Sequence, residues 1–209
     1  MCFDFETSSV SPKKAQIVQI AAVVIHGRKL EIKEGSEFNC LVKPLYGEEC
    51  AKAGLDELDD GAIKIHGKTH EMLKDAMSVK SALENFKEYV DGHNYRKNAW
   101  GAPIPVGYNS VGYDHPILDR ELATHSIPYF FHPMMRLDAI HFMWAFFEND
   151  KTVNSLSADN LIRKKMGYTK GTAHDALSDV IMTAELVCKT LHLIRNTAAK
   201  VKFDGCFNV

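Results

Sequence analysis

IVQIAAVVI, residues 17–25, is the stretch that decides the fold class. Most of its residues are β-branched and Gln19 is its only polar residue, which is typical of a largely buried strand. Residues 1–5 before it and residues 36–43 (SEFNCLVK) after it predict two further strands. The turn signal at His26 and Gly27 favours an antiparallel meander of these three strands.

Downstream, apolar residues recur at three-to-four-residue spacing, as in helices. Helices are predicted over residues 69–74, 79–90, 115–125, 157–166 and 175–194, a strand over 104–108, and a strand leading into a buried helix over 135–147. We expect residues 142–147 (FMWAFF) to lie in the core. Strands that come first and then alternate with helices predict an α/β fold, a mixed β-sheet flanked by α-helices. Because no linker or repeat interrupts the chain, we expect a single domain over residues 1–209.

Charge and cysteine usage bound the class of protein. The net charge of −2 excludes a protein that coats nucleic acid through global positive charge. The five cysteines form no CxxC pair, and we find neither a secretory signal nor a membrane-spanning run. We therefore expect a soluble, reduced, intracellular (cytoplasmic) protein with no membrane partner.

Acidic residues follow the first predicted strand. Asp4 and Glu6 are two residues apart, so on a strand their carboxylates share one face. Phe3 and Phe5 would then face the core. The alternative is an exposed strand end that is acidic without a function.

Two later segments are also acidic. Asp114 ends the strand-and-turn segment GYNSVGYD and precedes a helix start, so it could equally be an N-cap. Asn109, in the same segment, could equally be a turn residue. His174 lies five residues before Asp179, which falls in the last predicted helix. Taken alone, these two are a loop histidine and a solvated helix-face aspartate.

Taken together, the segments predict a metal site. Carboxylates about 4 Å apart repel by roughly 4 kcal/mol per pair at an effective dielectric constant near 20, so a cluster needs protons or cations. Oxygen ligands favour Mg²⁺ or Mn²⁺, and two such ions stabilise the attacking and leaving oxygens of a phosphoryl displacement. A histidine beside the site can take the proton of the attacking water. The pattern predicts a two-metal phosphodiesterase.

The three segments FDFET, GYNSVGYD and AHDALSD resemble, in order, the motifs of the DEDDh (DnaQ-like) family of 3′–5′ exonucleases, with wording closest to the exonuclease I branch. IHGKT at residues 65–69 resembles the family's IHGIT segment. The resemblance implies an RNase H-like mixed sheet with helices on both faces. It also implies two Mg²⁺ or Mn²⁺ ions held by four carboxylates, with one histidine as general base: Asp4, Glu6, Asp114 and Asp179, with His174.

Further roles follow from the resemblance. Thr7 and His66 would lie against the terminal nucleotide, and Asn109 and Tyr113 would be further substrate-side residues. The implied reaction is 3′–5′ hydrolysis of mainly single-stranded DNA to nucleoside 5′-monophosphates. Alternatives are a 3′–5′ exoribonuclease of the oligoribonuclease or tRNA-trimming type, or a proofreading subunit that acts with a polymerase in trans.

Two departures from the family pattern and one basic segment complete the sequence predictions. Only three residues precede Asp4, where the family has a longer first strand. Lys68 replaces a common isoleucine, and it would contact either phosphate or solvent. A basic segment next to His174, with Lys165 as its predicted substrate contact, could guide a nucleic acid backbone or could be a soluble helix end: Arg163, Lys164, Lys165 and Lys170.

Overall fold

A computed structural model describes residues 1–200 of the chain. The strands are β1 Cys2–Thr7, β2 Ile17–Val23, β3 Ile25–His26, β4 Glu31–Ile32, β5 Phe38–Lys43, β6 Met77–Ser78, β7 Val106–Gly107 and β8 Leu137–Asp138. The α-helices are α1 Gly47–Ala53, α2 Asp60–His66, α3 His70–Leu73, α4 Val79–Gly92, α5 Asp114–Thr124, α6 Ala139–Phe147 and α7 Ala176–Lys200. Residues 201–209, with Cys206 and the end of the predicted domain, lie outside the described residues.

Within residues 1–200, six strands form one mixed sheet in the order β6-β5-β2-β1-β7-β8. β1, β2 and β5 form the predicted antiparallel meander. β7 adds to β1, and β8 to β7, in parallel, and α5 connects these last two strands as parallel neighbours require. β3 and β4 form a separate two-stranded antiparallel ribbon on either side of the turn predicted at His26 and Gly27.

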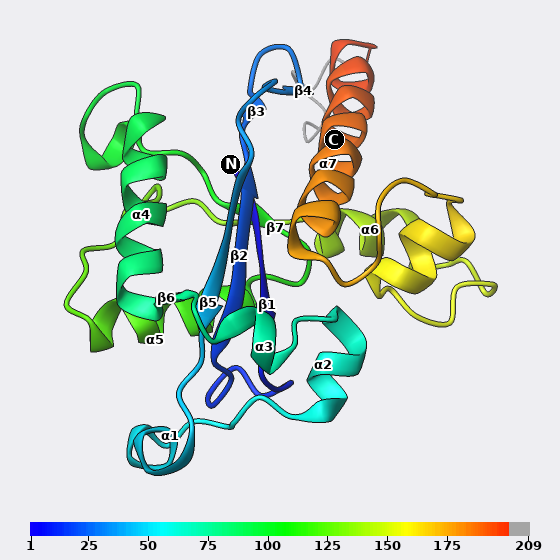
Figure 1. The fold of residues 1–209 in the computed structure, drawn as a ribbon. Helices are drawn as coiled ribbons and strands as arrows, with labels where there is room; N and C mark the ends of the chain where they lie inside the picture. Colours follow the sequence, from blue (N-terminus) through cyan, green and yellow to red (C-terminus); the bar gives the residue numbers. More distant parts are fainter. Residues whose placement is uncertain (201–209) are drawn as a thin grey trace.

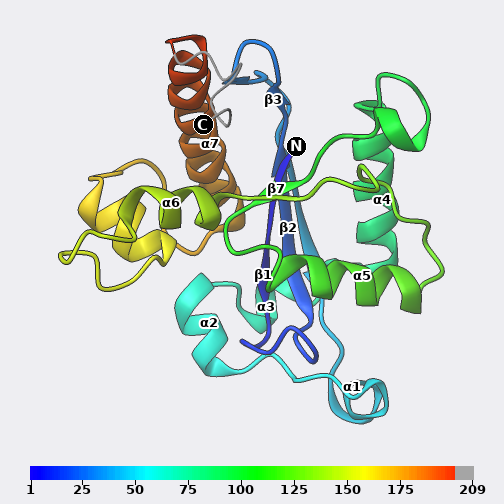
Figure 2. The ribbon, with the colours of Figure 1, turned by 180° about the vertical axis from the view of Figure 1, so that it is seen from behind.

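Helices cover both faces of the sheet, which confirms the predicted α/β architecture. α4 and α5 lie on one side and α6 and α7 on the other (Figures 1 and 2). Large apolar side chains fill the first layer, among them Phe3, Phe5 and Phe86. Small side chains such as Ala21 and Ala184 separate the sheet from α7, so this helix approaches the strands closely.

One core prediction was wrong. In residues 142–147 only Met143 is buried, at 2% exposure, whereas Trp144 and Phe146 are 60% and 48% exposed. α6 packs against its neighbours along one face, and its apolar residues continue around the helix onto the open face.

The segment before α7 is helical as predicted, but it is a π-helix, Asp159–Lys165. It starts after Ser157, whose hydroxyl accepts from the Asn160 amide at 3.3 Å, and ends before Gly167, where φ is +70°. Short π segments are frequent at functional sites. Among the described helices, none is long and apolar enough to cross a lipid bilayer.

Candidate active site

The first two acidic residues lie at the end of β1. Asp4 is opposite Ala21 of β2 and Glu6 is opposite Gln19. Strand alternation turns both carboxylates towards the side covered by α7, while Phe3 and Phe5 enter the aromatic layer on the other side.

Asp114 reaches the same place from the turn between β7 and α5. Its Oδ1 accepts a hydrogen bond from the Phe5 amide at 3.1 Å, so this carboxylate is fastened to β1 between Asp4 and Glu6. The turn before it is tight, since a Cβ at Gly107 would lie 2.4 Å from that of Ser110. Asp114 is the first residue of α5 and not its N-cap, which is Tyr113.

His174 and Asp179 arrive from the start of α7. His174 has a φ of +58° and donates its backbone amide to Asp179 Oδ2 at 2.9 Å. The other oxygen, Oδ1, accepts from Arg163 Nη2 of the π-helix at 2.7 Å. Both Asp179 oxygens therefore have protein partners.

These residues surround one cleft of about 260 Å³. Asp4, Glu6, His174 and Asp179 line it, and Asp114, 3% exposed, is not among the lining residues. The π-helix contributes Asp159 and Arg163 to the opposite wall. The structure thus brings three of the four predicted ligands and the predicted base to a common cleft, with the fourth carboxylate hydrogen-bonded to its floor.

The electrostatics show that the carboxylates crowd one another. Burial, followed by repulsion from Asp114 and Glu6, raises the pKa of Asp4 well above its usual range. Burial and then Asp179 raise the pKa of Glu6 to about 8, although Lys68 opposes this. Burial raises the pKa of Asp114 to about 7 in spite of hydrogen bonds from backbone amides. Such a cluster favours bound protons or cations.

The donor set fits hard divalent cations, because all four predicted ligands are carboxylates in mutual repulsion. Within residues 1–200, however, no three acidic, histidine or cysteine side chains already converge as a formed metal centre does. The Asp179 oxygens are turned to Arg163 and His174, and Asp114 to Phe5. Small side-chain movements are therefore needed to complete a coordination shell.

Thr7 and Tyr113 meet at the end of β1, and neither they nor His66 are among the residues that line the cleft. The hydroxyls of Thr7 and Tyr113 are 2.5 Å apart, and Tyr113 also donates to the Ser9 carbonyl. His66, at the end of α2, is 6% exposed and lies next to the Thr7 backbone. Burial and then Lys68 lower the pKa of His66, which favours its neutral form.

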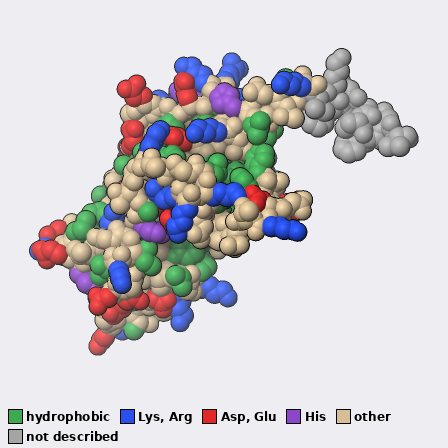
Figure 3. Space-filling view, turned by 90° about the vertical axis from the view of Figure 1, so that its right-hand side faces the viewer, with side chains coloured by type: hydrophobic (Ala, Val, Ile, Leu, Met, Phe, Trp, Pro, Cys, Tyr) green, Lys and Arg blue, Asp and Glu red, His purple; other side chains and the backbone are tan. Residues whose placement is uncertain are grey.

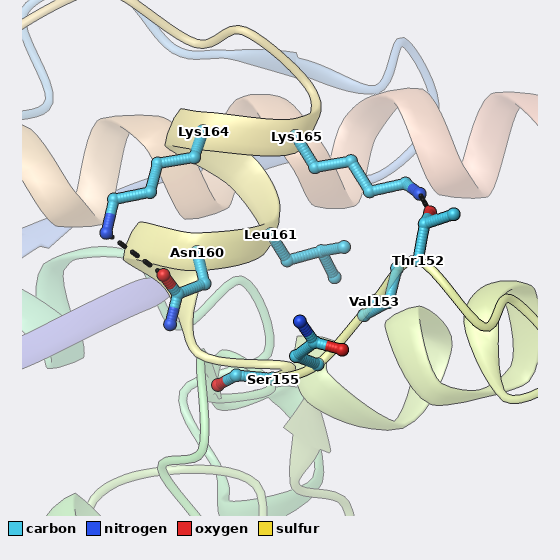
Figure 4. A pocket seen from close by; sticks show the side chains of 8 residues that line it. Thr152, Val153, Ser155, Asn160, Leu161, Lys164 and Lys165 are labelled. Carbon is cyan, nitrogen blue, oxygen red and sulfur yellow. Dashed lines mark hydrogen bonds between the residues drawn. The ribbon is translucent and has the colours of Figure 1, made fainter.

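Two predicted substrate residues lie elsewhere. Asn109 does not line the cleft, and its backbone amide donates to Asp138 Oδ1 at 2.7 Å. Lys165 extends to the far side of the π-helix, where Nζ is 2.6 Å from Asp150 and also bonds Thr152 (Figure 4). The structure does not bring either side chain into the cleft.

Two cations beside the site have partners that the sequence did not reveal. Lys68 is 9% exposed, with Nζ 2.8 Å from Asp175 Oδ1, so it faces neither solvent nor an open phosphate position. Burial raises the pKa of Asp175, but hydrogen bonds from Lys68 and Gln19 outweigh it and the net shift is downward. Arg163 was predicted only as part of a basic segment, and its pairing with Asp179 was missed.

Comparisons with known proteins agree with this geometry. The family model RNase_T, described as an exonuclease, matches residues 1–187. The PolC-type DNA polymerase III of Ureaplasma parvum is 22% identical over 188 residues, which are 88% of this chain and 11% of the polymerase. The chain therefore spans about a tenth of that relative.

Solved structures share the fold at low identity. Cell-death related nuclease 4 matches with a TM-score of 0.70 and 18% identity, covering 92% of this chain and 63% of that one. Escherichia coli exonuclease I in complex with a dT13 oligonucleotide matches with a TM-score of 0.69 and 18% identity. The match covers 95% of this chain and 41% of that one. The nuclease domain of 3′hExo, a DEDDh family member bound to rAMP, matches with a TM-score of 0.68 and 15% identity. The match covers 91% of this chain and 90% of that one. The architecture is the predicted RNase H-like one, and the chain belongs to the RNase_T family of exonucleases.

Proposed function

We propose that this chain is a metal-dependent 3′–5′ exonuclease that releases nucleoside 5′-monophosphates, mainly from single-stranded DNA. The observation that carries the proposal is the cleft in which Asp4, Glu6 and Asp179 face His174, with Asp114 fastened to the same strand. Family membership supports the reaction class. The DNA-bound exonuclease I structure supports the substrate class.

In the proposed mechanism the four carboxylates hold two Mg²⁺ or Mn²⁺ ions. When bound, these ions would supply charge stabilisation for the attacking and leaving oxygens. His174, an exposed side chain at the edge of the cleft, takes a proton from the attacking water. The water oxygen bonds to the terminal phosphorus, the bond from phosphorus to the preceding 3′ oxygen breaks, and that oxygen takes up a proton from the solvent. The products are a nucleoside 5′-monophosphate and a chain one residue shorter with a 3′-hydroxyl.

The nucleotide-side residues would position the terminal sugar and base. Thr7 and Tyr113 contact each other through their hydroxyl groups, and they are the neighbours in sequence of Glu6 and Asp114. Lys and Arg side chains gather near the centre of the face on which α6 and α7 lie (Figure 3), and such a surface attracts a phosphate backbone. This local charge fits a protein whose net charge is −2.

Two narrower alternatives rest on the comparisons. The rAMP-bound 3′hExo structure supports an exoribonuclease as the second candidate. The similarity to a PolC-type polymerase supports action with a polymerase partner in trans, since this chain corresponds to only a small part of that protein. We further propose that residues 1–209 act as one domain.

The test is digestion of 5′-labelled single- and double-stranded DNA and RNA with Mn²⁺, with Mg²⁺ or with EDTA. We expect a ladder that shortens from the 3′ end with either ion and disappears with EDTA, fastest on single-stranded DNA. Asp4→Asn is the control that excludes a contaminating nuclease. Faster digestion of RNA would select the exoribonuclease, and no metal-dependent ladder on any substrate would refute the proposal.

A further inference from the structure

Arg163 lies outside the three family motifs. Its guanidinium donates to Asp179 Oδ1 at 2.7 Å, and the two side chains are only 12% and 21% exposed. Because the His174 amide donates to Oδ2, each oxygen of this predicted metal ligand already accepts a hydrogen bond from the protein. In this arrangement Arg163 lines the same cleft as Asp4 and Glu6.

A guanidinium bonded to Asp179 repels a divalent ion bound by the same carboxylate, since both are cations, and this repulsion opposes ion binding. Lys68 differs in this respect. It pairs with Asp175, which is not one of the four predicted ligands, so it can stay in place when an ion binds.

Arg163 also has contacts that do not depend on Asp179. Nη1 donates to the Lys170 carbonyl at 3.3 Å, and the guanidinium carbon is 5.9 Å from the centre of the Tyr168 ring. The residue lies in the π-helix, a kind of segment that is frequent at functional sites. These contacts already exist beside the ion pair, so they can retain the guanidinium when its bond to Asp179 breaks.

We propose that Arg163 is an internal competitor for the divalent ion: it neutralises Asp179 when no ion is bound and leaves Asp179, towards Tyr168 and Lys170, when one binds. Arg163 is thus a positioning residue that sets the ion concentration at which the site assembles. The inference rests on the proposed function, because it takes Asp179 as a metal ligand.

The test uses metal affinity and stability, not activity. Mn²⁺ is titrated calorimetrically into the full chain after EDTA dialysis, for the wild type, Arg163→Gln and Arg163→Lys. We expect Arg163→Gln to bind Mn²⁺ about fivefold to tenfold more tightly, the size expected for one partly screened charge pair, and Arg163→Lys to lie closer to the wild type. Lys170→Gln removes one cation whose partner, Glu185, lies outside the cleft, and it controls for net charge.

Melting temperatures supply the second readout. Without metal, Arg163→Gln should melt below the wild type because the ion pair is lost, and Mn²⁺ should raise its melting temperature by more. Mn²⁺ affinity equal to that of Lys170→Gln, or weaker than that of the wild type, overturns the inference. If Arg163→Gln does not fold, Arg163→Met, which keeps the aliphatic stem and removes the charge, decides: Mn²⁺ affinity equal to or below that of Lys170→Gln then overturns the proposal.

The two proposals fail in different ways. Metal-dependent 3′ trimming by the wild type with unchanged affinity in the Arg163 variants refutes the competitor alone. Absence of trimming, together with Mn²⁺ binding that does not depend on Asp4, refutes the proposed function.

Discussion

The two faces of β1 differ completely although one six-residue strand supplies both. On one face Phe3 and Phe5 pack edge-to-face, with ring centres 5.3 Å apart, and Phe3 continues to Phe131 at 5.4 Å. On the other face Asp4 and Glu6 repel each other and their acidic neighbours. Packing on the aromatic face therefore supplies the stability that keeps the mutually repelling carboxylates of the acidic face in place.

The first prediction concerns a substitution on the acidic face. Asp4→Asn should lower kcat on a 3′-terminated oligonucleotide at least about 10³-fold, because metal charge stabilisation contributes several kcal/mol and each 1.4 kcal/mol is tenfold. The metal-free melting temperature should stay the same or rise, since the amide removes repulsion. The measurements are steady-state kinetics and calorimetry, with the exposed Asp119→Asn as control. Retained kcat would remove Asp4 from the site.

The second prediction breaks the aromatic face. Phe3→Ala should cost about 3–5 kcal/mol in the free energy of unfolding, because it empties a fully buried ring site. Phe3→Leu should cost much less. Denaturant unfolding measures both, and at a temperature where the variant is still folded its Mn²⁺ affinity should match the wild type. A change in affinity without a change in stability would contradict the division of labour between the faces.

The third prediction addresses the proposed base, His174, which lies in the loop before α7. His174→Ala should lower kcat about 10²-fold or more, as loss of a general base does, while Mn²⁺ binding persists. Mn²⁺ binding should survive the loss of turnover because His174 bonds Asp179 through its backbone amide, which the substitution keeps. Turnover equal to that of the wild type would exclude His174 from proton transfer.

The fourth prediction uses a histidine behind the aromatic face. His115 is fully buried with its ring 5.1 Å from that of Phe3, and burial, then Arg136, lowers its pKa to about 4. Because an unfolded histidine titrates near 6.5, folding stability should fall as the pH drops from about 6.5 to 4. His115→Leu should reduce that loss by about 2 kcal/mol in pH-dependent denaturant unfolding. An unchanged pH profile would show that the folded protein protonates His115 readily.

The fifth prediction is the opposite pH response of the acidic face. The pKa of Glu6 is about 8, above the value near 4.3 of an unfolded glutamate. The folded state therefore keeps a proton that the unfolded state releases, and metal-free stability should decline as the pH rises from about 4 to 8. Glu6→Gln should flatten this decline and raise the melting temperature at pH 8 by about 2–4 °C. If the metal-free stability of Glu6→Gln declined more steeply with pH than that of the wild type, the prediction would be wrong.

Local patterns in the sequence predicted more of the fold than of the site. Alternation along β1 predicted correctly which side chains face the core and which face outwards. Apolar spacing predicted α4, α5 and α7, and Ser78 caps α4 as expected. α1 and α2 were not predicted, and α6 was taken as buried because its composition does not say which face meets a neighbour.

The unpredicted parts of the site are pairings between distant residues. Lys68 and Asp175 are 107 positions apart, and only the folded chain shows that they meet. Arg163 and Asp179 are closer in sequence, but the direction of Arg163 depends on the π-helix. The metal and base roles that the family resemblance implies stay predictions, although the structure gathers Asp4, Glu6, Asp179 and His174 around one cleft.

The bond from the Phe5 amide to Asp114 spans 109 positions, and Asp179 lies still further along the chain. The order of the segments fixes the order in which the cleft can form: a growing chain carries Asp4 and Glu6 first, and their partners follow only when α5 and then α7 have emerged. Contacts of such sequence separation form slowly. A chain interrupted before α7 therefore carries Asp4 and Glu6 without Asp179, and the cleft is incomplete.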